Sequence, residues 1–166
     1  MLKQISLLIL CAVAIVLFAT PVHACTSAVV SGKVTLDGRP LLWKNRDTDF
    51  MRNHVDYVKG ERYDLIAVVN SANAYLKEAW MGTNSAGFAL MNTQSYNLVD
   101  VKGDEERGAA NGRVIYRALE VCATVEDFCH FLDTISKPSD IEANFGVIDA
   151  QGGAAMFEVD YYKYVM

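Results

Sequence analysis

The residue best suited to covalent chemistry in this sequence is a cysteine placed where a leader peptide would be cut. Cys25 follows Val22-His23-Ala24, and the small side chains at positions 22 and 24 suit a signal peptidase. Cleavage before Cys25 would give one residue both a thiol and a free α-amine. An α-amine titrates at about pH 8, so it can accept the thiol proton without help from a histidine. The pattern therefore predicts an N-terminal cysteine nucleophile.

The first 24 residues are typical of a secretory signal peptide. Lys3 supplies a positive start, and residues 5–19 form an apolar stretch shorter than the ~20 residues of a membrane span. We expect a mature chain of residues 25–166 in the periplasm or outside the cell, with membrane contact only through the signal. Two alternatives stay open. One is an uncleaved anchor. The other is a lipid on Cys25, which would make a non-catalytic anchored binding protein, although His23 fits a lipidation site poorly.

Composition narrows the possible partners and ligands. The mature chain would hold 142 residues with a formal charge of −6, which suits one soluble domain and argues against nucleic acid as a partner. Cys25, Cys122 and Cys129 remain, and none has metal-ligand spacing, so we expect no metal and no cofactor. A small buried side chain is the expected role of Cys122 and Cys129, and a disulfide between them stays open. A homo-oligomer is possible.

A predicted hairpin connects Cys25 to the next polar cluster. The sequence Asp-Gly at 37–38 is a strong hairpin signal between a strand over 26–35 and a returning strand over 41–47. Because the strands of a hairpin run antiparallel, the end of the second strand returns to the start of the first. We therefore expect residues 44–47 to lie near Cys25.

Those returning residues include two cations and a carboxylate. A cation at Lys44 or Arg46 would favour the thiolate form of Cys25, and the carboxylate of Asp47 would orient its α-ammonium group. The alternative is a solvated strand end, because exposed charged groups are common and contribute little.

Asparagine amides are the third group of candidates. Asn84, Asn92 and Asn97 carry N–H donors that suit an oxyanion hole. Asn84 precedes Ser-Ala-Gly and could simply be a turn residue. Asn92 ends an apolar strand, where asparagine has low β-propensity, so a functional role is the better explanation.

The remaining pattern predicts strands, then two helices, then strands. This order is typical of a layered α+β domain with helices on one face of a sheet. The final segment, 154–166, carries apolar residues on both faces and is expected to be one central or near-central strand. The expected helices are 108–121 and 125–136, and Thr124 with Asp127 resembles a capping box at the start of the second. The expected strands form three pairs: 54–60 with 64–70, 78–84 with 87–93 across a tight turn, and 144–150 with 154–160.

Several separated motifs together resemble a known enzyme group. The stretches "CTSAVV", "DGRPLLWKNRDTD", "WMGTNSAGFALMNTQSYNL" and "NFGVIDAQGGAAMFEVD" resemble the linear-amide hydrolases of the N-terminal nucleophile superfamily, of the penicillin acyltransferase and carcinine hydrolase type. Bile salt hydrolases and penicillin V acylases are more distant relatives. The resemblance implies an αββα sandwich with Cys25 as the nucleophile.

The resemblance also assigns roles to individual residues. In "KNRD", Lys44 takes the cation position, where these families carry arginine, and Asp47 is the aspartate. Lysine keeps the charge but loses bidentate geometry, for which Arg46 could compensate. Asn92 takes the place of the oxyanion-hole side chain, with Asn84 in a supporting position.

The resemblance further predicts the activity and the extent of the chain. It implies an exported amidase or acyltransferase that acts on a small-molecule amide through a thioester on Cys25. Members of these families are longer than this chain, and their remaining site asparagine and arginine would lie beyond Met166. We therefore expect an N-terminal part of the domain. An inactive truncated member is the alternative.

Overall fold

The computed structural model describes residues 25–72, 77–95, 98 and 108–166 of the chain. The expected signal peptide, residues 1–24, and Asn97 lie outside these residues. Within the described part, no helix has both the length and the apolar character that crossing a membrane requires.

A two-stranded antiparallel sheet begins the fold. It consists of β1 (Thr26–Val30) and β2 (Leu41–Asn45), with Thr26 opposite Asn45. The hairpin is confirmed, but the prediction that its first strand continues to residue 35 is wrong. The chain leaves the sheet after Val30, and the backbone at Gly32 packs so closely on the carbonyl of Gly38 that a side chain at position 32 would clash with it.

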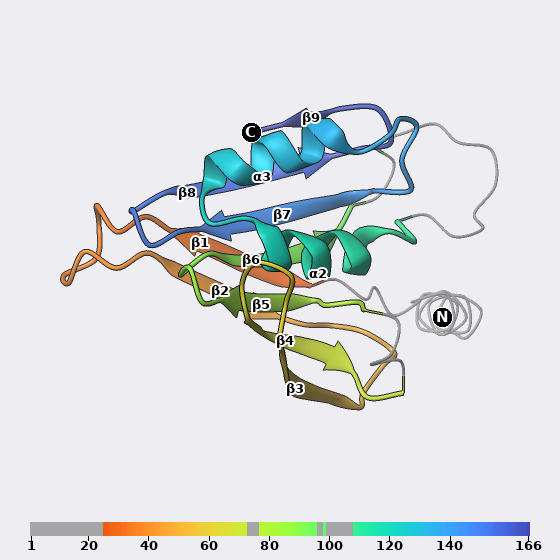
Figure 1. Cartoon of the computed structure of the whole chain (residues 1–166), viewed down its shortest axis with the longest axis horizontal. Helices are drawn as coiled ribbons and strands as arrows, with labels where there is room; N and C mark the ends of the chain where they lie inside the picture. The colour runs from red at the N-terminus through yellow and green to blue at the C-terminus, as the bar shows by residue number, and fades with distance from the viewer. Residues whose placement is uncertain (1–24, 73–76, 96–97, 99–107) are drawn as a thin grey trace, which may run out of the picture.

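A seven-stranded antiparallel sheet forms the centre of the molecule (Figure 1). Its strands pair in the order β3 to β9, so the chain leaves this sheet for the helices between β6 and β7, which are neighbours. The predicted pairs β3–β4, β5–β6 and β7–β8 are confirmed. The strands are β3 (Asn53–Val58), β4 (Leu65–Asn70), β5 (Met81–Asn84), β6 (Ala89–Gln94), β7 (Ala143–Ile148), β8 (Ala154–Val159) and β9 (Tyr164–Val165).

Two helices cover one face of this sheet (Figure 1). They are α2 (Asn111–Val121) and α3 (Val125–Thr134). Thr124 and Asp127 form a reciprocal capping box at the start of α3, as the sequence predicts. Phe128 on α3 packs edge-on against the rings of Phe145 and Phe157, which ties the helix to β7 and β8.

The small sheet packs on the opposite face of the large one. Side chains of Val29 and Leu42 approach Gly146 on β7 so closely that an added methyl group there would clash, and Met91 fills the same space. The described residues thus form a helix layer and two sheet layers, which confirms the α+β class. They supply three of the four layers of an αββα sandwich.

The prediction of one continuous strand over residues 154–166 is wrong. The chain turns after β8, where the Asp160 carboxylate accepts hydrogen bonds from the amides of Tyr162 and Lys163. The turn returns Tyr164 to the edge of the sheet beside Val159. An aspartate often stabilises a turn by accepting hydrogen bonds from the backbone amides two and three residues ahead. The hydrophobic pattern of a sequence does not reveal such a turn.

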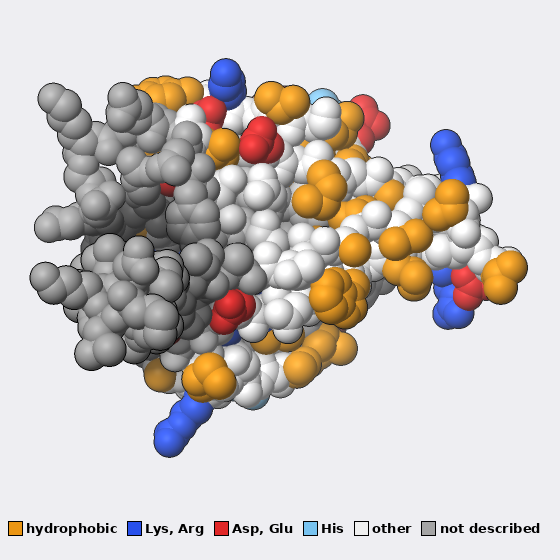
Figure 2. Space-filling model, turned by 180° about the vertical axis from the view of Figure 1, so that it is seen from behind, with side chains coloured by type: hydrophobic (Ala, Val, Ile, Leu, Met, Phe, Trp, Pro, Cys, Tyr) orange, Lys and Arg blue, Asp and Glu red, His pale blue; other side chains and the backbone are white. Residues whose placement is uncertain are grey.

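Apolar side chains remain exposed on the face away from the helices (Figure 2). Leu41 and Trp43 project outward from β2, and Val55, Tyr57 and Ile66 lie on the same side of β3 and β4. This face is therefore more apolar than the solvated side of most antiparallel sheets.

Candidate functional site

Five of the predicted site residues, Cys25, Lys44, Arg46, Asp47 and Asn92, meet in one cavity at the carboxyl end of β2. Its volume is about 180 Å³, which is large enough for a small molecular group. Strand β2 supplies Lys44, and the segment after β2 supplies the lining residues from Arg46 to Phe50. Asn92 and Gln94 of β6 form the opposite wall. The lining residues are Cys25, Lys44, Arg46, Asp47, Thr48, Phe50, Trp80, Asn92 and Gln94.

The hairpin register brings Cys25 to Asp47. Thr26 lies opposite Asn45, so the residues just outside this pair face one another. The Cys25 Sγ atom donates to the backbone carbonyl of Asp47 at 3.5 Å. The thiol contact predicted for Asp47 therefore involves its backbone, whereas the exposed side chain lines the cavity.

Lys44 is a half-buried cation of the cavity. Its Nζ atom donates to Oδ1 of Asn92 at 3.0 Å and to the carbonyl of Trp80 at 2.9 Å. Burial lowers the pKa of Lys44 to about 8, opposed by the negative charge that Cys25 can carry and assisted by repulsion from Arg46. At about pH 8, the Lys44 side chain is therefore protonated only about half of the time, whereas a solvated lysine is still fully charged.

Arg46 is clamped by neutral groups at the edge of the cavity. Its two terminal nitrogens donate to the Oδ1 atoms of Asn53 and Asn70, the second at 2.9 Å. The guanidinium carbon also lies 5.0 Å from the centre of the Trp80 ring, in cation–π geometry. Burial lowers the pKa of Arg46. The side chain therefore pins the end of β2 to the adjoining ends of β3 and β4.

Asn92 presents its amide to the cavity from β6. It is buried, with 4 % of its surface exposed, and lies opposite Phe145 in the sheet. Its oxygen accepts from Lys44, and among residues 25–72, 77–95, 98 and 108–166 the hydrogen bonds of its side chain do not include one donated by Nδ2. An N–H donor is thereby available in the cavity that contains the thiol, as an oxyanion hole requires.

Comparison with known proteins assigns the chain to a family. The family model for acyl-coenzyme A:6-aminopenicillanic acid acyl-transferase matches residues 36–164 of the chain. The chain belongs to this family. The match confirms the penicillin acyltransferase resemblance that the sequence motifs indicate, and it covers every cavity residue except Cys25.

Comparisons with individual proteins are more distant. No curated protein matches the chain. Among solved structures, the penicillin V acylase from Agrobacterium tumefaciens is similar, with 19 % sequence identity and a TM-score of 0.40 over 86 % of this chain. The chain spans 39 % of the length of that acylase.

Asn84 does not line the cavity that contains Cys25 and Asn92, so it lies apart from the other predicted site residues that the structure describes. Its Nδ2 group donates to the carbonyls of Leu119 and Cys122 at 2.8 and 2.7 Å. Its Oδ1 atom accepts from the amides of Ala86 and Phe88, both at 3.1 Å. The first two hydrogen bonds join the β5–β6 turn to the end of α2, and the other two close the turn itself, which corresponds to the turn interpretation.

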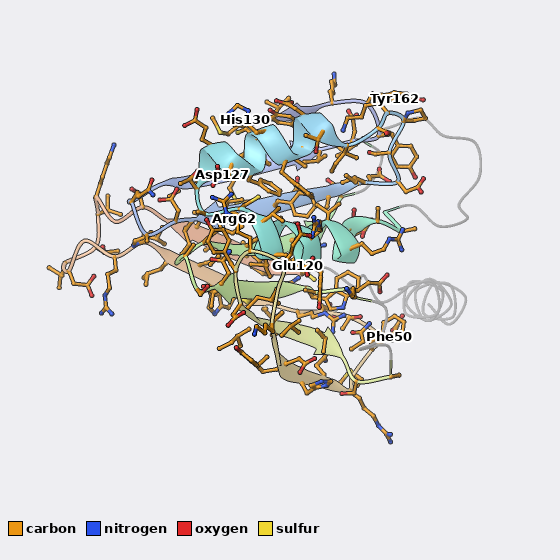
Figure 3. The ribbon with its side chains drawn as sticks, viewed as in Figure 1. Phe50, Arg62, Glu120, Asp127, His130 and Tyr162 are labelled. Carbon is orange, nitrogen blue, oxygen red and sulfur yellow. The ribbon has the colours of Figure 1, made fainter. Side chains whose placement is uncertain are left out.

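The other candidate nucleophiles and bases are also remote from the cavity. Burial raises the pKa of Cys122 to about 12 and also raises that of Cys129, and neither is bridged. His130 projects from α3, whereas the cavity residue Phe50 lies on the opposite side of the molecule in the same view (Figure 3). His54 contacts Ser71, so neither histidine lines the cavity.

Four cavity residues were missed by sequence reasoning: Thr48, Phe50, Trp80 and Gln94. Thr48 and Phe50 directly follow the charged cluster, so proximity in sequence could have found them. Trp80 contributes its carbonyl to Lys44 and its ring to Arg46. No local pattern marks it, because both contacts depend on how β4 and β5 place it beside β2.

Proposed function

We propose that this chain carries the nucleophile of an exported cysteine amidase or acyltransferase that acts on a small linear amide. The observation that supports this most directly is the common cavity: a thiol, two cations, a carboxylate and an asparagine amide line about 180 Å³. Family membership supports acyl transfer as the reaction class. The export signal and the role of Cys25 rest on the sequence.

The proposed reaction begins once the bond between Ala24 and Cys25 is cut. The freed α-amine accepts the thiol proton, and the Cys25 thiolate attacks the carbonyl carbon of the amide. The amide C–N bond then breaks, the amine leaves with a proton, and the acyl group remains as a thioester on Sγ. Water or a second amine attacks the thioester, releases the acid or the new amide, and restores the thiol.

The cavity residues would assist at different points of this cycle. The Nδ2 group of Asn92 would donate to the oxygen that becomes negatively charged as the carbonyl carbon turns tetrahedral. Lys44 would hold the Oδ1 atom of Asn92, and Arg46 would hold the end of β2 against β3 and β4. The Asp47 carboxylate would hold the α-ammonium that forms when the amine takes up the proton.

The experiment combines a mass measurement with an activity assay. The protein would be expressed from its complete gene, and the mass of its N-terminal peptide measured. A peptide that begins at an unmodified Cys25 is expected. A diacylglycerol on Cys25 would instead establish the anchored binding protein, because it blocks both the thiol and the amine.

The assay would use penicillin V, a conjugated bile salt and a β-alanyl amide as substrates. We expect hydrolysis of at least one of them by the wild type and none by Cys25→Ser. Cys129→Ser is the matched control, because it removes a partly exposed thiol outside the cavity and should leave the rate unchanged. Equal rates for wild type and Cys25→Ser would reject the proposed nucleophile.

A further inference from the structure

We propose that Lys44 is a positioning residue that fixes the orientation of the Asn92 carboxamide, so that the Nδ2 group faces the cavity and the oxygen does not. The inference rests on the proposed function, in which Asn92 binds the developing oxyanion. It adds a specific role for the lysine that stands where related enzymes are expected to carry arginine.

The argument starts from the two hydrogen bonds of the Lys44 ammonium. The Nζ atom is 3.0 Å from Oδ1 of Asn92 and 2.9 Å from the carbonyl oxygen of Trp80. A protonated lysine only donates hydrogen bonds. The Asn92 atom that faces it must therefore be the oxygen, because a flipped carboxamide would place two donors against each other in a buried site.

The orientation of the oxygen determines that of the nitrogen. The carboxamide is planar, so holding Oδ1 on Lys44 directs Nδ2 away from it. Among the hydrogen bonds of the part of the chain that the structure describes, Asn92 takes part through Oδ1, as the acceptor from Lys44, and not through Nδ2. Both Asn92 and Cys25 line the cavity. The Nδ2 group of Asn92 is thus free to donate a hydrogen bond to an oxygen of the substrate.

Lys44 can fix Asn92 only because it is itself held in place. Its backbone pairs with Ser27 in the small sheet, and its second acceptor, the Trp80 carbonyl, belongs to a residue whose amide bonds to Val68 at 3.0 Å. The ammonium is therefore held between the two sheets at the point where β2 faces β5 and β6. A cation on a solvated strand end could not impose an orientation in this way.

The proposed role differs measurably from a simple charge effect on the thiol. If Lys44 acts only through its charge, its contribution to catalysis does not depend on residue 92. If it acts by orienting Asn92, its contribution disappears once the carboxamide is removed. A double-mutant cycle separates these cases, because two residues that act through one contact give non-additive effects.

The cycle would compare wild type, Lys44→Met, Asn92→Ala and the double variant in kcat/KM for the amide that the enzyme hydrolyses. Loss of an oxyanion donor costs about 10²–10³-fold, which we expect for Asn92→Ala. Lys44→Met should cost about tenfold or more, and the double variant should be no slower than Asn92→Ala within about threefold. Lys44→Arg should restore most of the rate. The proposal would be overturned if the loss of kcat/KM in the double variant equalled the product of the losses in the two single variants.

A second measurement does not depend on activity. With asparagine labelled by ¹⁵N, the Nδ2 signal of Asn92 is identified by its loss in Asn92→Asp. We expect Lys44→Met to move this signal and Lys44→Arg to retain it, with the Asn84 signal unchanged in both. An unmoved Asn92 signal in Lys44→Met would overturn the proposal even if the wild type hydrolysed no tested amide, an outcome that by itself contradicts only the proposed function.

Discussion

The Sγ atom of Cys25 lies 3.5 Å from the backbone carbonyl oxygen of Asp47, a residue 22 positions further along the chain. Strand pairing explains this contact, because β1 begins at Thr26 and β2 ends at Asn45, and these two residues are partners. The thiol is therefore placed by backbone hydrogen bonds between strands. Its position does not depend on the charged side chains that surround it.

This placement predicts selective labelling of one thiol. We expect iodoacetamide at pH 7 to modify Cys25, because it lines a cavity beside two cations. Cys122 is fully buried with a pKa raised to about 12, and burial also raises the pKa of Cys129. Peptide mass mapping of the labelled protein measures the site. Cys25→Ser should lose the label, and label that persists in this variant on Cys129 would contradict the prediction.

The pKa of Lys44 predicts an unusual pH dependence of stability. It falls from 10.5 to about 8 on folding, mainly because of burial, so the unfolded state binds more protons between these values. The free energy of unfolding should therefore rise with pH from about 8 to about 10.5. Each unit of pKa shift corresponds to ~1.4 kcal/mol, so the rise contributed by Lys44 is of the order of 3 kcal/mol.

Lys44→Met is the variant that tests this pH dependence. Urea unfolding of wild type and variant would be compared at pH 7, 8, 9 and 10. The wild type should gain stability relative to the variant as the pH rises, because only the wild type sheds the cost of a buried charge. A constant difference across this range would show that Lys44 keeps an ordinary pKa in the folded protein.

Short sequence patterns predicted the turns, the start of a helix and the strand pairs, because these features depend on residues that are close together in the sequence. The Asp-Gly signal at 37–38 and the Thr124–Asp127 box gave the hairpin and the start of α3, and hydrophobic alternation gave the strand pairs. The predicted hairpin also implied that residues 44–47 lie near Cys25, as the contact between Cys25 and Asp47 shows. The clustering of Lys44 and Asp47 with Asn92 was predictable from the family resemblance, which gives all three a place in the site, and Arg46 lies between the first two in the sequence.

The features that escaped prediction depend on tertiary contacts. Asn84 and Asn92 end or follow similar apolar stretches, yet one binds the end of α2 and the other faces the cavity. Only the packing of helix and sheets distinguishes them. The turn at Asp160 was missed because alternating apolar residues continue across it, while its hydrogen bonds come from a single carboxylate.

The buried hydrogen bonds of Asn84 predict a structural role that can be separated from catalysis. Asn84→Ala would leave two carbonyls and two amides without their partner, so we expect a loss of about 2–4 kcal/mol in the free energy of unfolding. Asn84→Asp is the companion variant, because it keeps both acceptor contacts but turns a charged oxygen toward the carbonyls of Leu119 and Cys122. It should lose at least as much stability as Asn84→Ala.

The labelling rate of Cys25 provides the second readout for Asn84. Under conditions where the variant is folded, the rate should equal that of the wild type, since Asn84 does not line the cavity. A slowed rate in folded Asn84→Asp would instead assign this residue to the site.

Arg46 should hold the segment that carries Asp47, Thr48 and Phe50. Its guanidinium reaches Asn53 and Asn70 with separate nitrogens while it lies against Trp80, and a lysine has a single nitrogen that cannot serve both oxygens. We expect Arg46→Lys to cost about 1–2 kcal/mol in the free energy of unfolding, although the charge is kept.

Limited proteolysis measures the local consequence of losing this clamp. Chymotrypsin should cleave after Phe50 faster in Arg46→Lys than in the wild type, because the segment between β2 and β3 then opens more often. Arg113→Lys is the matched control, since Arg113 forms an exposed ion pair with Glu78 and should tolerate the same exchange. Equal cleavage after Phe50 in both variants would mean that the positive charge alone, and not the two-armed contact, maintains this wall of the cavity.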